Sequence, residues 1–487
     1  MKQYKMLFWL TILLITISTP VFAQWEGDQR LTNTAGNSFL AYNNAWNIAA
    51  SGDTVHVVFT DDQTGAAQIY YTCSYNAGIN WNAPIVLSQD TCNILSYTIA
   101  VSGSTVHVVW VNLWCRKLMY RRSTDAGVSW SQAVAVVNPG IQNVGDPCLA
   151  VSGNNVYLVY THNPSSGYNV DLFFISSMNG GVTWSVPQRL TYDANGIIDG
   201  APSIAVSGNI LHLIWVRTRP SNLYRRVLYL RSTNSGVSWE PERFITSDTI
   251  HQTQPVIAVA GSNVHVTWMD QRNNQIQIFY RMSSDNGANW QPENYLTEIS
   301  YTADYQTICA IGNNIHVAWR DFRTIPWHIG YRNSTNNGLT WQSDIILTPN
   351  SFTQEGPSIA AAGSKVHLIW YDDRNGNWEI YYKRNPTGSG IEEQTIENYK
   401  LKIDNFSVYP NPAKTYFTIR LPQTLNQVQG DKCVVKIFNV TGKIVKDEKL
   451  KGSKDEEFRI SLDGIKNGVY FIQAGDELIR EKLVITK

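Results

Sequence analysis

Three arginines follow the spacing Trp-x-Asp-x-Arg at the ends of short apolar stretches. The three copies are Trp268-x-Asp270-x-Arg272, Trp319-x-Asp321-x-Arg323 and Trp370-x-Asp372-x-Arg374. A guanidinium binds a carboxylate through two parallel hydrogen bonds, so these arginines and Arg217, in the preceding copy, are candidates for binding an acidic ligand. The aspartate two residues earlier is an alternative partner, and such a pair would hold a loop. We favour the ion pair, because the arginines recur at one register.

Aromatic side chains offer a second kind of chemistry, because they stack on sugar rings and on cations. Trp110, Trp215, Trp268, Trp319 and Trp370 recur at one strand position and are expected in the core. Three other tryptophans interrupt the repeat inside loops and are candidates for exposed contacts with a ligand: Trp114, Trp327 and Trp378.

Six histidines recur inside one strand type, and each is expected to form a hydrogen bond within its own repeat. They are His56, His107, His212, His265, His316 and His367. A constant register places them far apart, so they do not predict one metal site. The sequence also lacks H-x-x-x-H, C-x-x-C and D-x-D-x-D-G patterns, and we expect no metal and no cofactor.

The elements that position these residues are marked by an octapeptide of the form S-x-D-x-G-x-x-W. It occurs at Ser74–Trp81, Ser123–Trp130, Ser177–Trp184, Ser232–Trp239, Ser283–Trp290 and Ser334–Trp341. Its third residue is Asn76, Asp125, Asn179, Asn234, Asp285 or Asn336. Such a residue can accept a hydrogen bond from the backbone N–H two residues on, and the glycine supplies a positive φ. The pattern predicts a tight β-hairpin.

A second marker, a hairpin glycine, recurs at intervals of about fifty residues, which is typical of propeller blades. The seven glycines are Gly52, Gly103, Gly153, Gly208, Gly261, Gly312 and Gly363. Each unit has four short β segments, but the seventh lacks its last strand and its octapeptide. Residues 25–32 resemble residues 184–191, so we predict that this N-terminal strand completes the last blade. The expected fold is all-β, with seven blades rather than six.

The octapeptides resemble the Asp-box, or bacterial neuraminidase repeat, of sialidase-like β-propellers. That resemblance implies a pocket in which three arginines clamp a sugar carboxylate, an aspartate acts as general acid/base and a tyrosine activated by a glutamate attacks the sugar. The residues of these types here are Arg272, Arg323 and Arg374, with Asp62, Tyr305 and Glu355. The chain departs from those enzymes, because the R-I-P motif expected near the start of the propeller is absent and their rings have six blades.

The C-terminal part differs in composition: lysine becomes more frequent and tryptophan disappears. The segments Tyr409–Pro412, Ile437–Lys443 and Asn467–Ile472 resemble the type A C-terminal sorting domain of type IX secretion. This resemblance implies handling by the type IX secretion machinery and delivery to the cell surface or release. The expected domains are a propeller at 24–384, a linker at 385–404 and a small β-sandwich sorting domain at 405–487.

Residues 1–23 have a positive start, an apolar run and a small-residue cleavage site, which together predict a signal peptide. No other stretch is long and apolar enough to span a bilayer. Among the 487 residues, Lys plus Arg equals Asp plus Glu, so no basic excess points to nucleic acid. Export permits disulfides, and Cys92 and Cys115 are the proposed bridge.

These observations favour a secreted propeller that binds glycan or protein at the cell surface without catalysis. The alternative is an exo-acting glycoside hydrolase of the sialidase kind, and a third possibility is an adhesion scaffold. The arginines discriminate between binding and catalysis. Convergence on one pocket would favour the enzyme, whereas pairing of each arginine with the aspartate two residues earlier would oppose it.

Overall fold

The computed structural model describes two compact units, Met1–Glu392 and Glu393–Lys487. The described residues are 25–41, 47–88, 94, 96–112, 116–138, 143–163, 169–192, 196–219, 224–246, 251–272, 275–298, 301–387, 407–409, 413–420, 433–439, 444–450, 457–474 and 480–485. The predicted signal peptide, most of the predicted linker, Trp114 and the Cys92–Cys115 pair lie outside these residues. The division between the units falls within 385–404.

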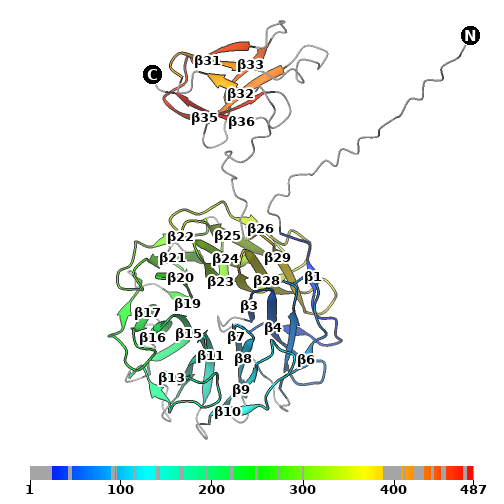
Figure 1. Cartoon of the computed structure of the whole chain (residues 1–487), viewed down its shortest axis with the longest axis vertical. Coiled ribbons are helices and arrows are strands. Elements are labelled where there is room, and N and C mark those ends of the chain that lie inside the picture. The colour runs from blue at the N-terminus through cyan, green and yellow to red at the C-terminus, as the bar shows by residue number, and fades with distance from the viewer. Residues whose placement is uncertain are drawn as a thin grey trace, which may run out of the picture. The chain divides into compact units, whose positions relative to one another are not determined.

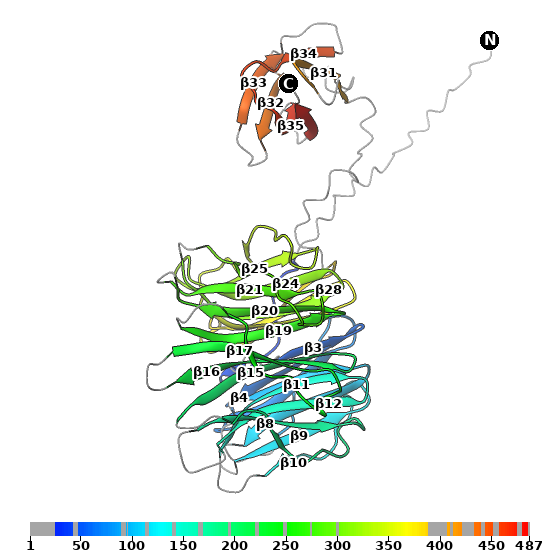
Figure 2. The same ribbon diagram turned by 90° about the vertical axis from the view of Figure 1, so that its left-hand side faces the viewer.

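Unit one is a ring of seven antiparallel sheets, the seven blades that the sequence predicts, and its described residues contain no helix (Figures 1 and 2). The first strand of each blade lies next to the central channel. In chain order these first strands are β3 (Ile48–Ser51), β7 (Tyr97–Ser102), β11 (Val144–Ser152), β15 (Ile198–Ser207), β19 (Gln252–Ala260), β23 (Ala303–Ile311) and β27 (Gln354–Ala362). The second strands are β4 (Thr54–Asp61), β8 (Thr105–Asn112), β12 (Asn155–His162), β16 (Ile210–Arg219), β20 (Asn263–Asp270), β24 (Asn314–Asp321) and β28 (Lys365–Asp372).

The third strands lead into the octapeptides, and the fourth strands are short outer strands. The third strands are β5 (Gln68–Ser74), β9 (Lys117–Ser123), β13 (Asp171–Ser177), β17 (Tyr224–Ser232), β21 (Gln277–Ser283), β25 (His328–Ser334) and β29 (Glu379–Asn385). The fourth strands are β6 (Ile85–Val86), β10 (Val134–Val137), β14 (Gln188–Arg189), β18 (Arg243–Phe244), β22 (Asn294–Tyr295), β26 (Ile345–Ile346) and, in blade 7, β1 (Gln29–Arg30). A further short strand, β2 (Ser38–Phe39), pairs with β4.

The N-terminal strand closes the ring, as the sequence predicts. Gln29 of β1 pairs with Tyr382 of β29, and Arg30 pairs with Tyr381. The Glu26 backbone N–H donates to the Arg384 carbonyl at 2.9 Å. The earliest described strand of the chain is therefore the outer strand of its last blade. It covers the edge of β29 that would otherwise be unpaired.

The alternation of strand direction gives the ring two faces. Face one carries the loops between second and third strands and the connections from each blade to the next. Face two carries the hairpins between first and second strands together with the octapeptides, here called Asp boxes. The second strands are buried almost throughout, because each blade packs against a neighbour on both sides. Trp110, Trp215, Trp268, Trp319 and Trp370 are fully buried, as expected of core residues.

Each Asp box is held by its serine and its Asp or Asn side chain. In blade 2 the Ser123 Oγ accepts from the Gly127 N–H at 2.8 Å and donates to Asp125 Oδ1 at 2.7 Å. Asp125 Oδ1 also accepts from the Ser129 N–H at 2.9 Å. The bond therefore reaches four residues on rather than the two that we expected. Gly127 has φ 91° and Ala126 has φ 56°, so both residues adopt the left-handed conformation.

The Asp boxes also join neighbouring blades. The box tryptophan of each blade packs edge-on against an aromatic ring in the third strand of the preceding blade, with ring centroids 4.8–5.4 Å apart. The pairs are Tyr71–Trp130, Tyr120–Trp184, Phe174–Trp239, Tyr229–Trp290, Tyr280–Trp341 and Tyr382–Trp81. In blade 7 the same place is taken by Trp25, whose ring lies 5.0 Å from that of Tyr331. The N-terminal segment thus supplies the missing tryptophan of the seventh box.

The repeated histidines bond within their own blades, as predicted. In blades 1, 2, 4, 5, 6 and 7, the histidine Nδ1 lies 2.7–2.8 Å from the hydroxyl of the third-strand tyrosine that supports the next Asp box. Blade 3 has Tyr157 and Phe174 at these two positions, with stacked rings. Burial lowers the pKa of all six imidazoles, in four of them to about 4 and in His212 and His367 to about 3.

Unit two contains two antiparallel sheets. One is formed by β30 (Ser407–Tyr409), β31 (Tyr416–Arg420) and β34 (Glu457–Ser461). The other has the order β33 (Ile444–Leu450), β32 (Cys433–Asn439), β35 (Gly468–Ala474) and β36 (Arg480–Ile485). Phe417, Ile437, Ile460, Leu462 and Ile472 are almost fully buried and form part of its core.

Candidate functional site

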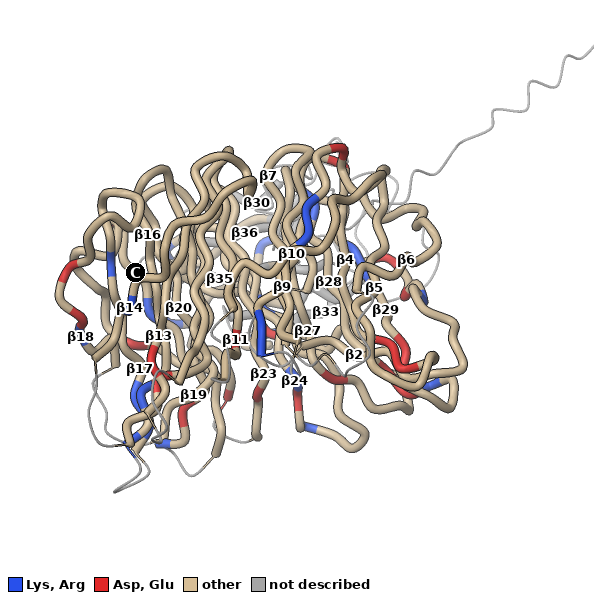
Figure 3. The backbone as a smooth tube through the Cα atoms, turned by 90° about the horizontal axis from the view of Figure 1, so that it is seen from below, with Lys and Arg blue, Asp and Glu red and all other residues tan. Residues whose placement is uncertain are grey.

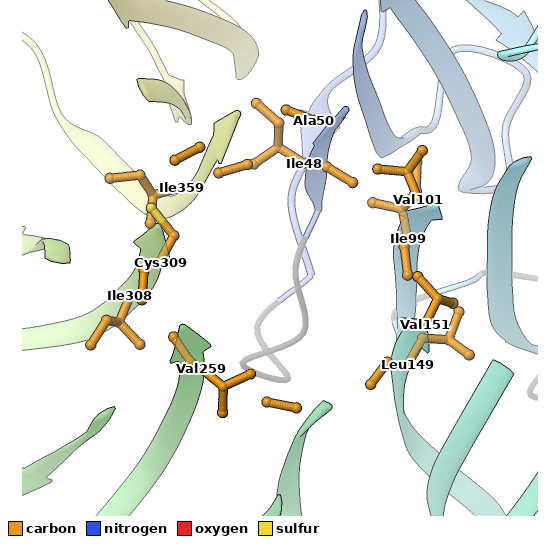
Figure 4. A pocket seen from close by; sticks show the side chains of 18 of the residues that line it. Ile48, Ala50, Ile99, Val101, Leu149, Val151, Val259, Ile308, Cys309 and Ile359 are labelled. Carbon is orange, nitrogen blue, oxygen red and sulfur yellow. The ribbon is translucent and has the colours of Figure 1, made fainter. Parts of the chain in front are cut away.

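The central channel contains a cavity of about 240 Å³ lined by the first strands of all seven blades. Its side chains are small and apolar, with the Cys309 thiol as their only polar group (Figure 4). A wall of this kind offers no acid, base or charged group for chemistry. The side chains that can recognise a polar ligand lie at face one, where the strands end in loops.

The three repeated arginines each bind the aspartate two residues earlier. Nη2 of Arg272 lies 2.6 Å from Asp270, and the corresponding distances are 3.0 Å for Arg323–Asp321 and 2.5 Å for Arg374–Asp372. All three aspartates are almost fully buried at the ends of second strands. The ion pair within each blade, which we favoured from the sequence, is therefore present in all three copies.

A second carboxylate completes each pair, and the sequence analysis did not identify it. It belongs to the residue just before the fourth strand of the same blade. Nη1 of Arg272 binds Glu293 at 2.8 Å, Nη1 of Arg323 binds Asp344 at 2.8 Å, and Nη1 of Arg374 binds Asp28 at 2.9 Å. Each guanidinium thus links the end of a second strand to the start of a fourth strand, which is a structural role repeated in blades 5, 6 and 7.

Arg217 in blade 4 follows the same plan with a different first partner. Its Nε and Nη2 bind the two carboxylate oxygens of Asp199, each at 2.9 Å, and Asp199 belongs to the first strand. Nη2 also binds Glu242 at 3.0 Å, just before the fourth strand. The Arg217 side chain is only 8% exposed, so it is a buried clamp between strands rather than an exposed one.

Arg320 is a face-one arginine that departs from this plan, and sequence reasoning missed it. It follows Trp319 in β24, so it points to the opposite side of the sheet from Asp321. Its Nε and Nη2 bind both oxygens of Asp304 at 2.8 Å, and Nη1 binds Glu355 of the next blade at 3.1 Å. A signal existed in the sequence: the other six blades have Thr, Val, Thr, Val, Met and Tyr at this register, namely Thr60, Val111, Thr161, Val216, Met269 and Tyr371.

Aromatic rings surround the Arg320 guanidinium. Its Cζ lies 4.5 Å from the centroid of the Tyr305 ring, 4.9 Å from that of Phe322 and 4.8 Å from that of Trp327. We call Asp304, Tyr305, Arg320, Phe322, Trp327 and Glu355 the blade-6 cluster. Burial raises the pKa of the Asp304 carboxyl above its usual value, although its bonds to Arg320 act in the opposite direction.

Tyr305 is held in a strained backbone conformation with φ 50°. It lies at a bulge in β23, where the pairing with β24 shifts between Asp304 and Thr307. First-strand bulges with a positive φ occur at the same place in five successive blades, at Asp146, Ala201, Gln254, Tyr305 and Gly356. An L-residue in this conformation costs about 1–2 kcal/mol, and such strain gathers at functional sites. Among the five, Tyr305 alone presents an aromatic ring.

The candidate catalytic residues are only partly brought together. Tyr305 and Glu355 both contact Arg320, and Glu355 also accepts a hydrogen bond from the Tyr371 hydroxyl at 3.0 Å. Asp62 lies in blade 1, where its Oδ1 accepts from the Asn37 N–H at 2.7 Å. The structure therefore places the tyrosine and the glutamate around one guanidinium and the aspartate on a different blade.

The candidate contact tryptophans differ in their surroundings. Trp327 packs against Phe322 with ring centroids 4.9 Å apart and joins the blade-6 cluster. Trp378 packs edge-on against Tyr371 at 5.3 Å and contributes to the core between blades 7 and 1. Trp327 is therefore the better placed of the two to meet a ligand.

A pocket of about 600 Å³ adjoins the blade-6 cluster. It is lined by Gln275, Tyr301, Thr302, Phe322 and Arg323, so Phe322 belongs to both. Arg323 is 31% exposed and lies 4.7 Å from the centroid of the Tyr301 ring, and the Tyr301 hydroxyl donates to Asp344 at 3.1 Å. The cluster and the pocket form one surface of aromatic, amide and hydroxyl groups on face one.

In the described part of the chain, no group of three or more His, Cys, Asp or Glu side chains is placed to hold a metal ion. The same residues contain no helix with the length and apolar character of a membrane span.

Two family models match parts of the chain, one in each unit. Residues 117–312 match the model of the BNR repeat-like domain, and residues 407–486 match that of the secretion system C-terminal sorting domain. No curated protein matches the chain.

Solved structures with the same kind of fold include the polysaccharide lyase Uly1, with a TM-score of 0.52 and 10% identity over 74% of this chain and 99% of the lyase. A sialidase of Trypanosoma rangeli gives a TM-score of 0.43 and 11% identity, over 60% of this chain and 54% of that one. The GH93 α-L-arabinofuranosidase of Fusarium graminearum gives 0.44 and 14%, over 61% and 93%. At such identities the likeness concerns the fold alone. The chain thus folds as a seven-bladed β-propeller of which residues 117–312 match the BNR repeat-like domain, and it carries a C-terminal sorting domain that indicates export by type IX secretion to the cell surface or out of the cell.

Proposed function

We propose that the propeller binds uncharged glycan chains on face one, through the blade-6 cluster and the adjoining pocket, without cleaving them. The observation that supports this most directly is the gathering of Tyr305, Phe322 and Trp327 around one guanidinium beside a polar pocket. Aromatic faces pack against the C–H groups of sugar rings, and amide and hydroxyl groups beside them bond the sugar hydroxyls.

The charges of this surface favour an uncharged ligand over an acidic one. Arg320 is bound by Asp304 and Glu355, and Arg323 is bound by Asp321 and Asp344. Two guanidiniums therefore face four carboxylates. A sugar carboxylate entering this surface would have to displace a protein carboxylate from each arginine and leave it unpaired. The same pairing argues against an arginine clamp of the sialidase kind.

A glycan array with the purified exported form tests this proposal. We expect binding of uncharged oligosaccharides and weaker binding of their sialylated or uronic acid counterparts. Trp327→Ala and Phe322→Ala should each lower affinity about tenfold, which corresponds to roughly 1.4 kcal/mol of lost stacking. Tyr295→Ala removes a 55% exposed ring from an outer strand and is the matched control. Equal loss in the control, or a preference for acidic glycans, would refute the proposal.

An exo-acting glycoside hydrolase is the second candidate, because Tyr305 and Glu355 share Arg320. In this alternative Tyr305 attacks the sugar, Glu355 activates it and Asp62 is the general acid/base. A fluorogenic sialoside distinguishes the two candidates. Turnover by the wild-type protein that disappears in Tyr305→Phe would replace binding with hydrolysis, whereas we expect no turnover.

Removal of residues 1–23 during export remains part of the proposal. The contacts of the next described residues support it: Trp25 packs on Tyr331, and Glu26 forms a bidentate ion pair with Arg384 at 2.6 and 2.7 Å. The folded propeller thus begins to make native contacts within two residues of the predicted cleavage site. N-terminal sequencing of the exported protein should give Gln24, and a start beyond Trp25 would contradict the proposal.

A further inference from the structure

The Asp boxes, which lie on face two, carry an aliphatic side chain at one repeated position, directly after the box glycine. Five of the six boxes have a large aliphatic residue there, and the sixth has Ala288. Their exposed fractions are 54% for Ile79, 70% for Val128, 59% for Val182, 79% for Val237 and 72% for Leu339. None of these side chains contributes to the core, so folding of the box does not account for their apolar character.

The loops of face two carry few charges. Within the six Asp boxes the only charged residues are Asp125 and Asp285, because the other boxes have asparagine. Within the hairpins between first and second strands they are Asp53 and Lys365, which pair with each other at 2.6 Å. In Figure 3 the upper edge of the ring is largely free of charged residues, whereas the lower edge, below β17, carries many of them.

Both ends of the propeller's chain leave it on face two. Asn385 pairs with Val366 in blade 7, as Ser74 pairs with Val55 in blade 1, so it occupies the first position of an Asp box. Its Oδ1 accepts from the Thr387 N–H at 3.1 Å, and Trp25 fills the tryptophan position of the same blade. The seventh box is therefore open, and the segment toward the sorting domain begins there.

We propose that face two rests on a lipid bilayer surface, with the Asp-box aliphatic side chains inserted at the interface and face one turned away from the membrane. Side chains on five separate blades at one level of a ring can all be covered at once only by a broad, flat surface. The scarcity of charge fits insertion into a lipid interface rather than binding to a polyanion. The chain toward the sorting domain also starts from this face.

Co-sedimentation with vesicles of pure phosphatidylcholine tests this proposal on the exported full-length protein. The test variant carries Val128→Ser, Val182→Ser, Val237→Ser and Leu339→Ser, all at exposed positions where folding should be unaffected. We expect the wild type to bind the vesicles, with little change between 0.1 and about 1 M salt because the contact is apolar. The quadruple variant should bind about tenfold more weakly or not at all.

The matched control removes equally exposed apolar groups from face one. Ile325 and Tyr192 are 91% and 73% exposed, and Ile325→Ser with Tyr192→Ser should leave vesicle binding unchanged. Absence of binding by the wild type, or equal loss in the control variant, would overturn the proposal. Sedimentation velocity provides the remaining arm: a wild-type dimer that becomes a monomer in the quadruple variant would show that face two is covered by a second copy and not by lipid. Glycan binding on face one should be unaffected in the quadruple variant.

Discussion

Face two of the propeller repeats almost without change from blade to blade, whereas face one varies between blades. The Asp boxes share one geometry, and each packs its tryptophan on the third-strand ring of the preceding blade. On face one, Arg272, Arg323 and Arg374 repeat one structural clamp within their own blades, whereas Arg320 binds Glu355 of the next blade. A residue that recurs around a ring serves the fold, because every blade must meet its neighbour in the same way. A residue that breaks the repeat is not required for these contacts between blades and can bind a ligand instead.

Acid titration probes the repeated part and should have the largest effect. The unfolded chain protonates its histidines below pH 6.5, whereas burial keeps the six repeated imidazoles neutral down to about pH 4. The unfolded state binds more protons in that window, so the free energy of unfolding should fall as pH falls, by about 1.4 kcal/mol per pH unit for each imidazole. Urea unfolding between pH 7 and 4 measures this slope.

Blade 3 provides the control for the acid effect, because it has Tyr157 and Phe174 in place of the histidine and tyrosine. Transferring that pair to blade 5, as His265→Tyr with Tyr280→Phe, should remove the contribution of one imidazole, so that the slope of the unfolding free energy against pH falls by about 1.4 kcal/mol per pH unit. An unchanged slope would assign the acid sensitivity to carboxylates instead.

A pair of glycine substitutions on face two should have the next largest effect. A Cβ added at Gly127 would lie 1.8 Å from the Tyr71 hydroxyl, whereas one at Gly103 meets nothing within 4 Å. Both glycines have a positive φ, so Gly103→Ala should cost about 1 kcal/mol and Gly127→Ala more than about 3 kcal/mol. Thermal unfolding measures both, and similar losses would show that the box does not depend on contact with the preceding blade.

Tyr305→Gly on face one should change stability least. Glycine relieves the strain at φ 50°, and this gain of about 1 kcal/mol roughly offsets the lost contact with Arg320. The unfolding free energy should therefore stay within about 1 kcal/mol of the wild type, while glycan affinity falls. A loss of stability as large as that of Gly127→Ala would place Tyr305 with the structural residues and remove the contrast between the two faces.

The Asp-box pattern and the glycine period predicted seven blades, the likeness of residues 25–32 to 184–191 predicted the closing N-terminal strand, and the Trp-Asp-Arg spacing predicted the ion pairs within blades. These features depend on local spacing, which recurs and can be counted. The second carboxylates, Glu293, Asp344 and Asp28, were not predicted, because they approach their arginines across strands. Tyr305, Trp327 and Glu355 of the blade-6 cluster were candidates from the sequence, but Arg320, which contacts all three, was missed. Only the packing of two blades brings Glu355 to Arg320.

By itself, the sequence determined what each blade is: period-two strands, a left-handed turn at each glycine and a carboxylate two residues before each repeated arginine. Those are short-range properties, set by backbone sterics and by which side chains share one face of a strand. The tertiary structure alone decided which side chains meet across strands and between blades. Which ring supports which Asp box, which guanidinium acquires a second acid and which side chains meet at face one all follow from how seven twisted sheets close around a common axis.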